Sequence, residues 1–125
     1  MKLEDAKILV GDDSVFARKQ IIDTLKKLGI TNILEASNGK QALQLFEDEK
    51  PDLVFIDIVM PVMDGNIALE CMIAQNPNAK IVVVSSVGSQ GQLKRAVSAG
   101  VKDFVQKPLK ESQIEKIVRT QLEES

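Results

Sequence analysis

The chain of 125 residues contains no histidine, and this absence excludes several classes of chemistry. A Ser-His-Asp hydrolase needs an imidazole base, many metal sites need imidazole ligands, and a phosphohistidine carrier needs the residue itself. The single cysteine, Cys71, has no partner for an internal disulfide. Any chemistry must therefore use the side chains of Asp, Glu, Lys, Ser, Thr or Cys.

Aromatic residues and long apolar runs are also scarce. Phenylalanine supplies all of the 3% aromatic content, and the net charge is −2, so we expect no direct binding of nucleic acid. No apolar run approaches the roughly 20 residues that span a bilayer, and no signal peptide is visible. We expect a soluble, cytoplasmic protein without membrane insertion.

What the chain does contain is a regular alternation of two patterns. Five short runs rich in β-branched residues predict strands, and the segments between them carry apolar residues at helical spacing. The predicted strands are 6–11, 33–37, 51–57, 79–86 and 102–107. The predicted helices are 14–28, 38–50, 68–75, 91–100 and 112–124. The length suits one domain, 1–125, with no output domain.

Local details of the helices follow from single residues. Ser14 or Asp13 is expected to cap the first helix, whose apolar face is predicted to include Val15. Gly29 is expected to end that helix. Gly65 is expected to supply an unusual backbone conformation ahead of the third helix.

Strands that alternate with helices and are apolar almost throughout predict an α/β fold, in which a parallel sheet is covered on both faces. In such sheets ligands bind at the carboxyl ends of the strands. Polar side chains follow four of the predicted strands: Asp12, Asp13, Asp57, Ser85, Ser86 and Lys107. We therefore expect these side chains to converge on one crevice.

Each of these residues also has a structural interpretation. Asp13 is more often a helix cap than a ligand, and a serine at a strand end commonly bonds to nearby backbone. Lys107 could be a solvated surface lysine, and Asp57 could be a turn residue. These interpretations give no reason for polar residues at the same end of four strands, so the set favours a functional site.

The chemistry of such a crevice depends on its three carboxylates. Three carboxylates close together repel one another unless a cation is present, and one lysine compensates only in part. A hard divalent ion such as Mg²⁺ uses carboxylates, water and phosphoryl oxygens as ligands. A carboxylate can also attack phosphorus and form an aspartyl phosphate. Phosphoryl transfer with Mg²⁺ is therefore the chemistry that these residue types predict.

The motifs that carry this pattern are ILVGDDS (8–14), FIDIVMPVMDG (55–65), VVVSS (82–86), AGVKDF (99–104) and KPL (107–109). With these motifs in this order, the chain resembles the receiver domains of response regulators in bacterial two-component signalling, and especially CheY-like stand-alone receivers. The resemblance implies a doubly wound, flavodoxin-like domain with five parallel strands in the order 2-1-3-4-5.

The resemblance also implies a role for individual residues. Asp57 matches the phosphoacceptor, and the implied metal ligands are Asp12, Asp13, Asp57 and the backbone carbonyl of Val59. Lys107 matches the lysine that pairs with the phosphoryl group, and the peptide bond before Pro108 is often cis in the family. Ser85 matches the hydroxyl that moves to a phosphoryl oxygen, and Phe104 matches the aromatic switch. Phe104 replaces the tyrosine of the best-known CheY proteins, so an output that needs a tyrosine hydroxyl is not implied.

The implied partners are a sensor histidine kinase and a downstream protein such as a flagellar motor component, and a monomer is expected. The implied activity is that of a phosphoacceptor switch rather than an enzyme, with self-phosphorylation from small donors and autodephosphorylation typical of the family. A phosphorelay intermediate and a receiver cut from a larger regulator remain open.

Two other classes can be compared with the same residues. A Mg²⁺-dependent phosphatase of the haloacid-dehalogenase type needs a second aspartate two residues after the nucleophile, where this chain has Val59. A flavin-binding electron carrier uses a similar sheet, but acids at the phosphate end of its first strand oppose that function.

Overall fold

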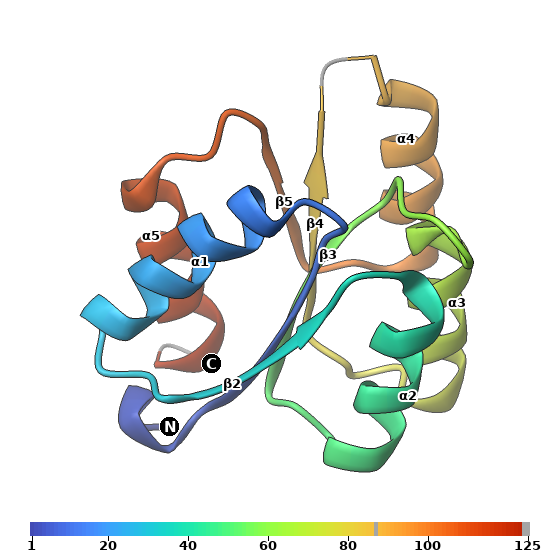
Figure 1. Cartoon of the computed structure of the whole chain (residues 1–125). Helices are drawn as coiled ribbons and strands as arrows, with labels where there is room; N and C mark the ends of the chain where they lie inside the picture. Colours follow the sequence, from blue (N-terminus) through green and yellow to red (C-terminus); the bar gives the residue numbers. More distant parts are fainter. Residues whose placement is uncertain (87, 124–125) are drawn as a thin grey trace.

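Five β-strands and five α-helices alternate along the computed structural model, which describes residues 1–86 and 88–123 (Figure 1). The strands are β1 (Lys7–Gly11), β2 (Asn32–Ala36), β3 (Leu53–Asp57), β4 (Ile81–Ser85) and β5 (Asp103–Gln106). The helices are α1 (Val15–Lys27), α2 (Gly39–Glu49), α3 (Gly65–Gln75), α4 (Gln90–Ala99) and α5 (Glu111–Leu122). A short 3-10 helix, Leu3–Asp5, precedes β1 and was not predicted.

The sheet has the strand order β2-β1-β3-β4-β5, and every neighbouring pair is parallel, so the predicted fold class is confirmed. β1 and β3 lie side by side in the middle of the sheet. The chain adds β2 on one side of β1 and then adds β3, β4 and β5 on the other side, so the strand order changes direction between β1 and β3. Because the strands are parallel, the carboxyl ends of β1, β3, β4 and β5 lie at the same edge of the sheet. None of the described helices is long and apolar enough to cross a membrane.

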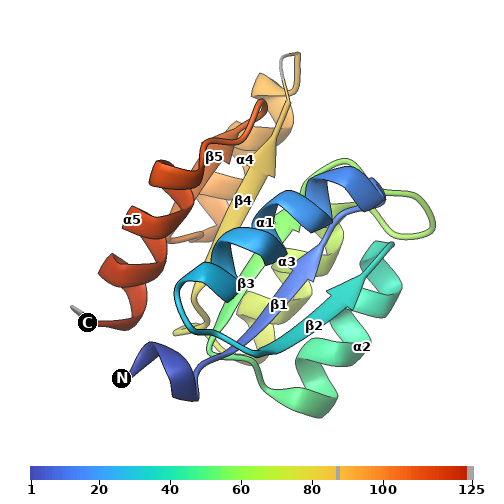
Figure 2. The ribbon, with the colours of Figure 1, turned by 60° about the vertical axis from the view of Figure 1, so that its left-hand side comes forward.

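Two apolar cores fill the two faces of the sheet, and successive strand residues alternate between them. In β3, Phe55 packs into the core beneath α1 and α5, whereas Ile56 packs into the core beneath α2, α3 and α4. Figure 2 shows α1 and α5 together on one face of the sheet. Because both faces of β3 are covered, each of its five residues is buried.

Of the two residues predicted as possible caps of the first helix, Ser14 and Asp13, the structure has Ser14. Ser14 is the N-cap of α1, and its hydroxyl oxygen accepts a hydrogen bond from the backbone N–H of Ala17 at 3.2 Å. The prediction that Val15 belongs to the apolar face is wrong, because Val15 is 69% exposed at the solvent side of the first turn. Gly29 follows the end of α1 with a φ of 89°, as its position predicted.

The third helix begins at Gly65, three residues before the predicted start. Gly65 does not have a positive φ, so the unusual backbone conformation that was predicted for it is not found. A Cβ atom at this position would lie 2.0 Å from the carbonyl oxygen of Asp57, so the residue is needed for close packing. The predicted end of the third helix at residue 75 is confirmed, and the other predicted helix ends differ by one or two residues; position 124 lies outside the described residues.

Candidate functional site

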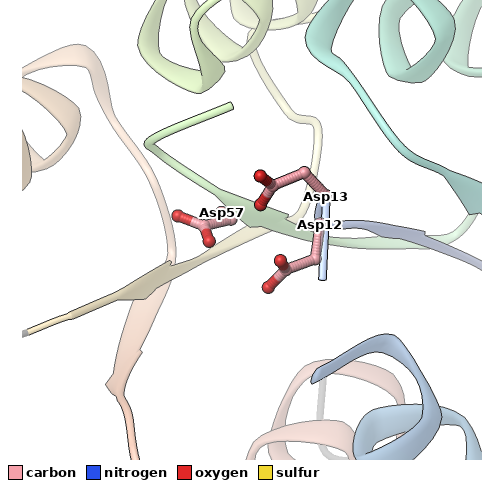
Figure 3. Close-up of side chains that lie close together, drawn as sticks. All are labelled: Asp12, Asp13 and Asp57. Carbon is pink, nitrogen blue, oxygen red and sulfur yellow. The ribbon is translucent and has the colours of Figure 1, made fainter. Parts of the chain in front are cut away.

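Three aspartates lie together at the carboxyl edge of the sheet (Figure 3). Asp12 and Asp13 directly follow β1, and Asp57 is the last residue of the neighbouring strand β3. One ligand oxygen from each of the three carboxyl groups lies within 4.8 Å of the others. Asp12 and Asp57 are buried and Asp13 is exposed, so the cluster opens to solvent on one side.

Lys107 reaches this cluster from the end of β5. Its Nζ atom donates a hydrogen bond to Asp57 Oδ2 at 3.0 Å and lies 3.1 Å from Asp12 Oδ2. The second contact is an ion pair without hydrogen-bond geometry, since Asp12 Oδ2 is a buried oxygen without a hydrogen-bond partner among the described residues. The Lys107–Pro108 peptide bond is cis. Lys107 therefore pairs with two of the three carboxyl groups, those of Asp12 and Asp57.

The shared charges shift the pKa values of two groups in the site. Burial raises the pKa of Asp12, and the nearby charge of Asp57 raises it further, against the opposing effects of the Ser14 N–H and Lys107. Burial lowers the pKa of Lys107, but the hydrogen bond to Asp57 and the negative charges of Asp57 and Asp12 outweigh burial, so that the net shift is upward. The lysine is therefore a cation at neutral pH, and the crevice keeps a negative charge that Lys107 does not cancel.

Ser85 and Ser86 occupy different environments at the end of β4. Ser85 is 1% exposed, and its Oγ atom has no hydrogen-bond partner among the described residues. Ser86 is exposed, and its backbone N–H and carbonyl both contact the hydroxyl of Ser89. A buried hydroxyl without a partner is unusual, because an unmade hydrogen bond costs free energy in the native state.

Two further residues of the predicted site are Val59, in the segment after β3, and Phe104, within β5. The backbone N–H of Val59 donates to Asp57 Oδ1 at 2.9 Å, which fixes one oxygen of that carboxyl group. Phe104, in the edge strand β5, pairs with Val83 of β4 and is 47% exposed. A half-exposed phenylalanine has room to change its side-chain position.

Sequence reasoning missed Arg18, which supports the acidic segment from α1. Its Nη1 atom donates to the backbone carbonyl of Asp12 at 2.6 Å, and its Nε atom pairs with Glu35 of β2 at 3.1 Å. The arginine therefore holds the segment after β1 against the neighbouring strand. No spacing rule links Arg18 to Glu35, so only the packing of α1 on the sheet reveals the contact.

Sequence reasoning also missed Asn66, which is 1% exposed in the first turn of α3. Its Nδ2 atom donates to the backbone carbonyl of Gln92 in α4 at 3.0 Å. A signal was present, because Asn66 precedes Leu69 by three residues and so lies on the apolar face of its helix. A polar residue on such a face needs a specific partner.

The arrangement is suited to two kinds of chemistry. Three carboxylates, of which Asp12 and Asp57 are buried and Asp13 is exposed, can supply oxygen ligands to a hard divalent cation. A carboxylate held between a backbone N–H and a lysine can accept a group that carries negative oxygens, because the same lysine can then neutralise those oxygens.

Comparisons with known proteins agree with this geometry. Residues 8–119 match the response regulator receiver domain family. The chain is 39% identical to the chemotaxis protein CheY of Thermotoga maritima, over 86% of this chain and 90% of that protein. It is 40% identical to the chemotaxis protein CheY of Bacillus subtilis, with the same coverage.

A solved structure extends the comparison to three dimensions. The chain superimposes with a TM-score of 0.85 and 30% identity on a chain of the CheX-CheY-BeF3-Mg+2 complex from Borrelia burgdorferi, over 92% of this chain and 87% of that one. The chain therefore belongs to the response regulator receiver domain family, as a CheY-like receiver that acts as a phosphorylation-activated signalling switch in chemotaxis or two-component pathways.

Proposed function

We propose that Asp57 accepts a phosphoryl group from the phosphohistidine of a sensor kinase. The observation that carries this proposal is the contact between Asp57 Oδ2 and Lys107 Nζ at 3.0 Å, inside a cluster of three aspartates. Asp57 is 6% exposed, yet it lies at the open edge of the sheet, where a donor group can approach. A structural ion pair alone would not need two further acids beside it.

The transfer exchanges one bond for another. An oxygen of the Asp57 carboxylate forms a bond to phosphorus while the bond between phosphorus and the histidine nitrogen breaks, and the electron pair of that bond stays on the nitrogen. Lys107 pairs with an oxygen of the transferred group. The hydroxyl of Ser85 donates to another oxygen and thereby gains the hydrogen-bond partner that it lacks among the described residues.

Asp12, Asp13, Asp57 and the carbonyl of Val59 would hold Mg²⁺. The donor set fits this ion, because the ligands are all oxygens and Asp12 Oδ2 is a buried acceptor without a hydrogen bond. When bound, Mg²⁺ supplies charge neutralisation for the carboxylates and for the phosphoryl oxygens. The other oxygen of Asp12, Oδ1, accepts a hydrogen bond from the backbone N–H of Ser14 at 2.9 Å, and this bond orients the carboxyl group.

A protein partner would recognise the phosphorylated state through the position of Phe104. We propose that movement of Ser85 toward the phosphoryl group makes space into which the half-exposed ring of Phe104 turns. The change alters the surface of β5 and its neighbouring helices and thereby the affinity for the partner. A flagellar motor component is the partner that similarity to chemotaxis proteins supports.

We also propose that residues 1–125 act as a monomeric, stand-alone receiver in the cytoplasm. Support for the stand-alone role comes from the chemotaxis relatives, because this chain covers 90% of the length of the Thermotoga and Bacillus proteins.

The experiment compares two aspartates at opposite ends of β3. The protein is incubated with Mg²⁺ and acetyl phosphate, and intact mass spectrometry measures the gain of one phosphoryl group. We expect Asp57→Asn to abolish the gain and the matched variant Asp52→Asn to retain it. Phosphorylation that persists in Asp57→Asn would contradict the proposal.

A further inference from the structure

Asn66 forms a buried connection between two helices that contact different parts of the site. It belongs to the first turn of α3, which follows the loop after Asp57, whereas its partner Gln92 belongs to the first turn of α4, which follows β4 and Ser85. The two helices lie side by side on one face of the sheet (Figure 1). The hydrogen bond therefore joins the segment of the phosphoacceptor to the segment of the serine hydroxyl.

The α3 side of this connection is fixed to the end of β3. The N–H of Gly65 donates to the carbonyl of Ile58 at 3.2 Å, and the backbone of Gly65 lies against the carbonyl of Asp57 so closely that a Cβ atom would be 2.0 Å away. Asp64 caps the helix by accepting from the N–H of Asn66 at 2.7 Å. Asn66 is therefore held in a constant position relative to Asp57.

The α4 side is connected to Ser85 through a short turn. The hydroxyl of Ser89 donates to the carbonyl of Ser86 at 2.6 Å and accepts from the N–H of Ser86 at 3.2 Å, so the N-cap of α4 is bonded to the residue after Ser85. A displacement of Ser85 and Ser86 toward Asp57 would thus carry the first turn of α4 with it. The hydrogen bond between Asn66 and Gln92 therefore joins the start of α3, which is fixed to β3, to the first turn of α4, which would move.

The side chain of Asn66 is only half satisfied in this arrangement. Its Nδ2 atom is bonded to Gln92, but its Oδ1 atom is buried without a hydrogen-bond partner among the described residues. Loss of the bond to Gln92 would leave the whole buried amide without a partner, and this cost opposes the displacement of α4. An apolar side chain at the same place would carry no such cost.

We propose that Asn66 is a positioning residue that holds α4 in the arrangement seen here. Its bond to Gln92 thereby sets how much binding free energy a phosphoryl group at Asp57 must supply before α4 moves. This inference rests on the proposed function of Asp57. A side chain that stabilises one of two arrangements must weaken the binding of every ligand that favours the other arrangement, because ligand binding and the conformational change are linked equilibria. Removal of the amide should therefore strengthen the binding of a phosphoryl mimic at a site that Asn66 does not touch.

The experiment measures the affinity of beryllofluoride in the presence of Mg²⁺ for the wild-type protein and for Asn66→Leu. Leucine keeps the side-chain volume and removes both polar atoms. Because the chain has no tryptophan or tyrosine, binding is followed by the backbone amide signals in nuclear magnetic resonance spectra. We expect beryllofluoride to bind about fivefold more tightly to Asn66→Leu, and the amides of 92–96 to exchange with solvent faster in the free variant.

Two matched controls separate this role from general destabilisation. Gln92→Ala keeps the backbone carbonyl that accepts the bond, and Glu70→Gln removes the exposed ion pair with Arg95 between the same two helices. Both variants should bind beryllofluoride with wild-type affinity, because the backbone carbonyl of residue 92 is kept in the first and an exposed ion pair contributes little to stability in the second. A purely structural role for Asn66 would lower the melting temperature of the variant without tightening the binding.

The outcomes distinguish the two proposals. Wild-type protein that binds no beryllofluoride with Mg²⁺ would contradict the proposed function. Wild-type protein that binds it, together with a folded Asn66→Leu variant of equal or weaker affinity, would overturn the role of Asn66 alone. If the leucine variant does not fold, the wild-type protein still decides, because the side-chain amide signals of Asn66 must shift when beryllofluoride binds. Unchanged signals would overturn the inference.

Discussion

Asp52 and Asp57 bracket the same buried strand, but their carboxyl groups have opposite surroundings. Asp52 precedes β3 at the amino end of the sheet, where its Oδ2 atom accepts from the N–H of Lys7 at 2.8 Å and its own N–H donates to the carbonyl of Lys7 at 2.7 Å. Asp57 ends β3 among two other acids and one lysine. The first aspartate joins two strands, whereas the second lies in a site with excess negative charge.

The same contrast holds for the polar groups around each aspartate. At the amino end, Lys80 donates to the carbonyl of Gln121 and the N-terminal ammonium group donates to the carbonyl of Leu122, which brings Met1 to the end of α5 (Figure 1). At the carboxyl end, Asp12 Oδ2 and Ser85 Oγ are buried without hydrogen bonds among the described residues. The polar groups named at the amino end have hydrogen-bond partners, whereas these two atoms at the carboxyl end lie where a ligand is expected to complete them.

Exchange of one lysine at each end gives the sharpest test of this contrast. We expect Lys107→Met to slow phosphorylation by acetyl phosphate about a hundredfold or more, because a donor that neutralises the transferred oxygens is lost. Lys80→Met should leave the rate unchanged, since the ammonium group of Lys80 hydrogen-bonds only to the carbonyl of Gln121 among the described residues. The rate is measured by intact mass against time, and equal rates for the two variants would contradict the contrast.

Two glycines test how tightly each end is packed. Gly65→Ala should lower the free energy of unfolding by about 3 kcal/mol, because its Cβ atom would collide with the carbonyl of Asp57. Gly29→Ala, at the amino end, has open space around the new atom and should cost about 1 kcal/mol through its positive φ alone. Urea denaturation measures both values. A smaller loss in Gly65→Ala than in Gly29→Ala would show that the carboxyl end yields to the extra atom.

Substitution of Asp12 tests whether the buried carboxyl group at the carboxyl edge of the sheet lowers the stability of the protein. Because the pKa of Asp12 is raised in the folded protein, the folded state binds more protons than the unfolded state, and stability falls as the pH rises above the ordinary value of a carboxyl group. Asp12→Asn removes this loss. We therefore expect the variant to be more stable than the wild-type protein at neutral pH by about 1 kcal/mol, and the difference to disappear in acid.

Addition of Mg²⁺ provides the control for Asp12. The ion should raise the melting temperature of the wild-type protein, because a ligand that binds the folded state stabilises it, and it should do so much less for Asp12→Asn. A variant that is less stable than the wild-type protein at neutral pH would indicate that the Asp12 carboxylate supports the fold, as Asp52 does.

The sequence by itself determined the fold class and the membership of the charged cluster. Apolar runs of strand length, separated by amphipathic segments, permit few arrangements other than a covered parallel sheet, and the acids and the lysine directly follow those runs. Asp12, Asp13, Asp57 and Lys107 could be predicted as neighbours because the carboxyl ends of parallel strands meet at one edge. Local chemistry also predicted the break at Gly29 and a cap at Ser14 or Asp13, of which the folded chain uses Ser14.

Only the tertiary structure decided the contacts between elements that no local pattern relates. Val15 matched the helical period but lies at the solvent side of α1, because the period does not fix where a helix end stands on the sheet. Gly65 is required by the approach of α3 to Asp57 rather than by its own φ. The bond of Asn66 to Gln92 depends on how α3 and α4 pack, and packing is set by the shapes of whole surfaces that meet only in the folded chain.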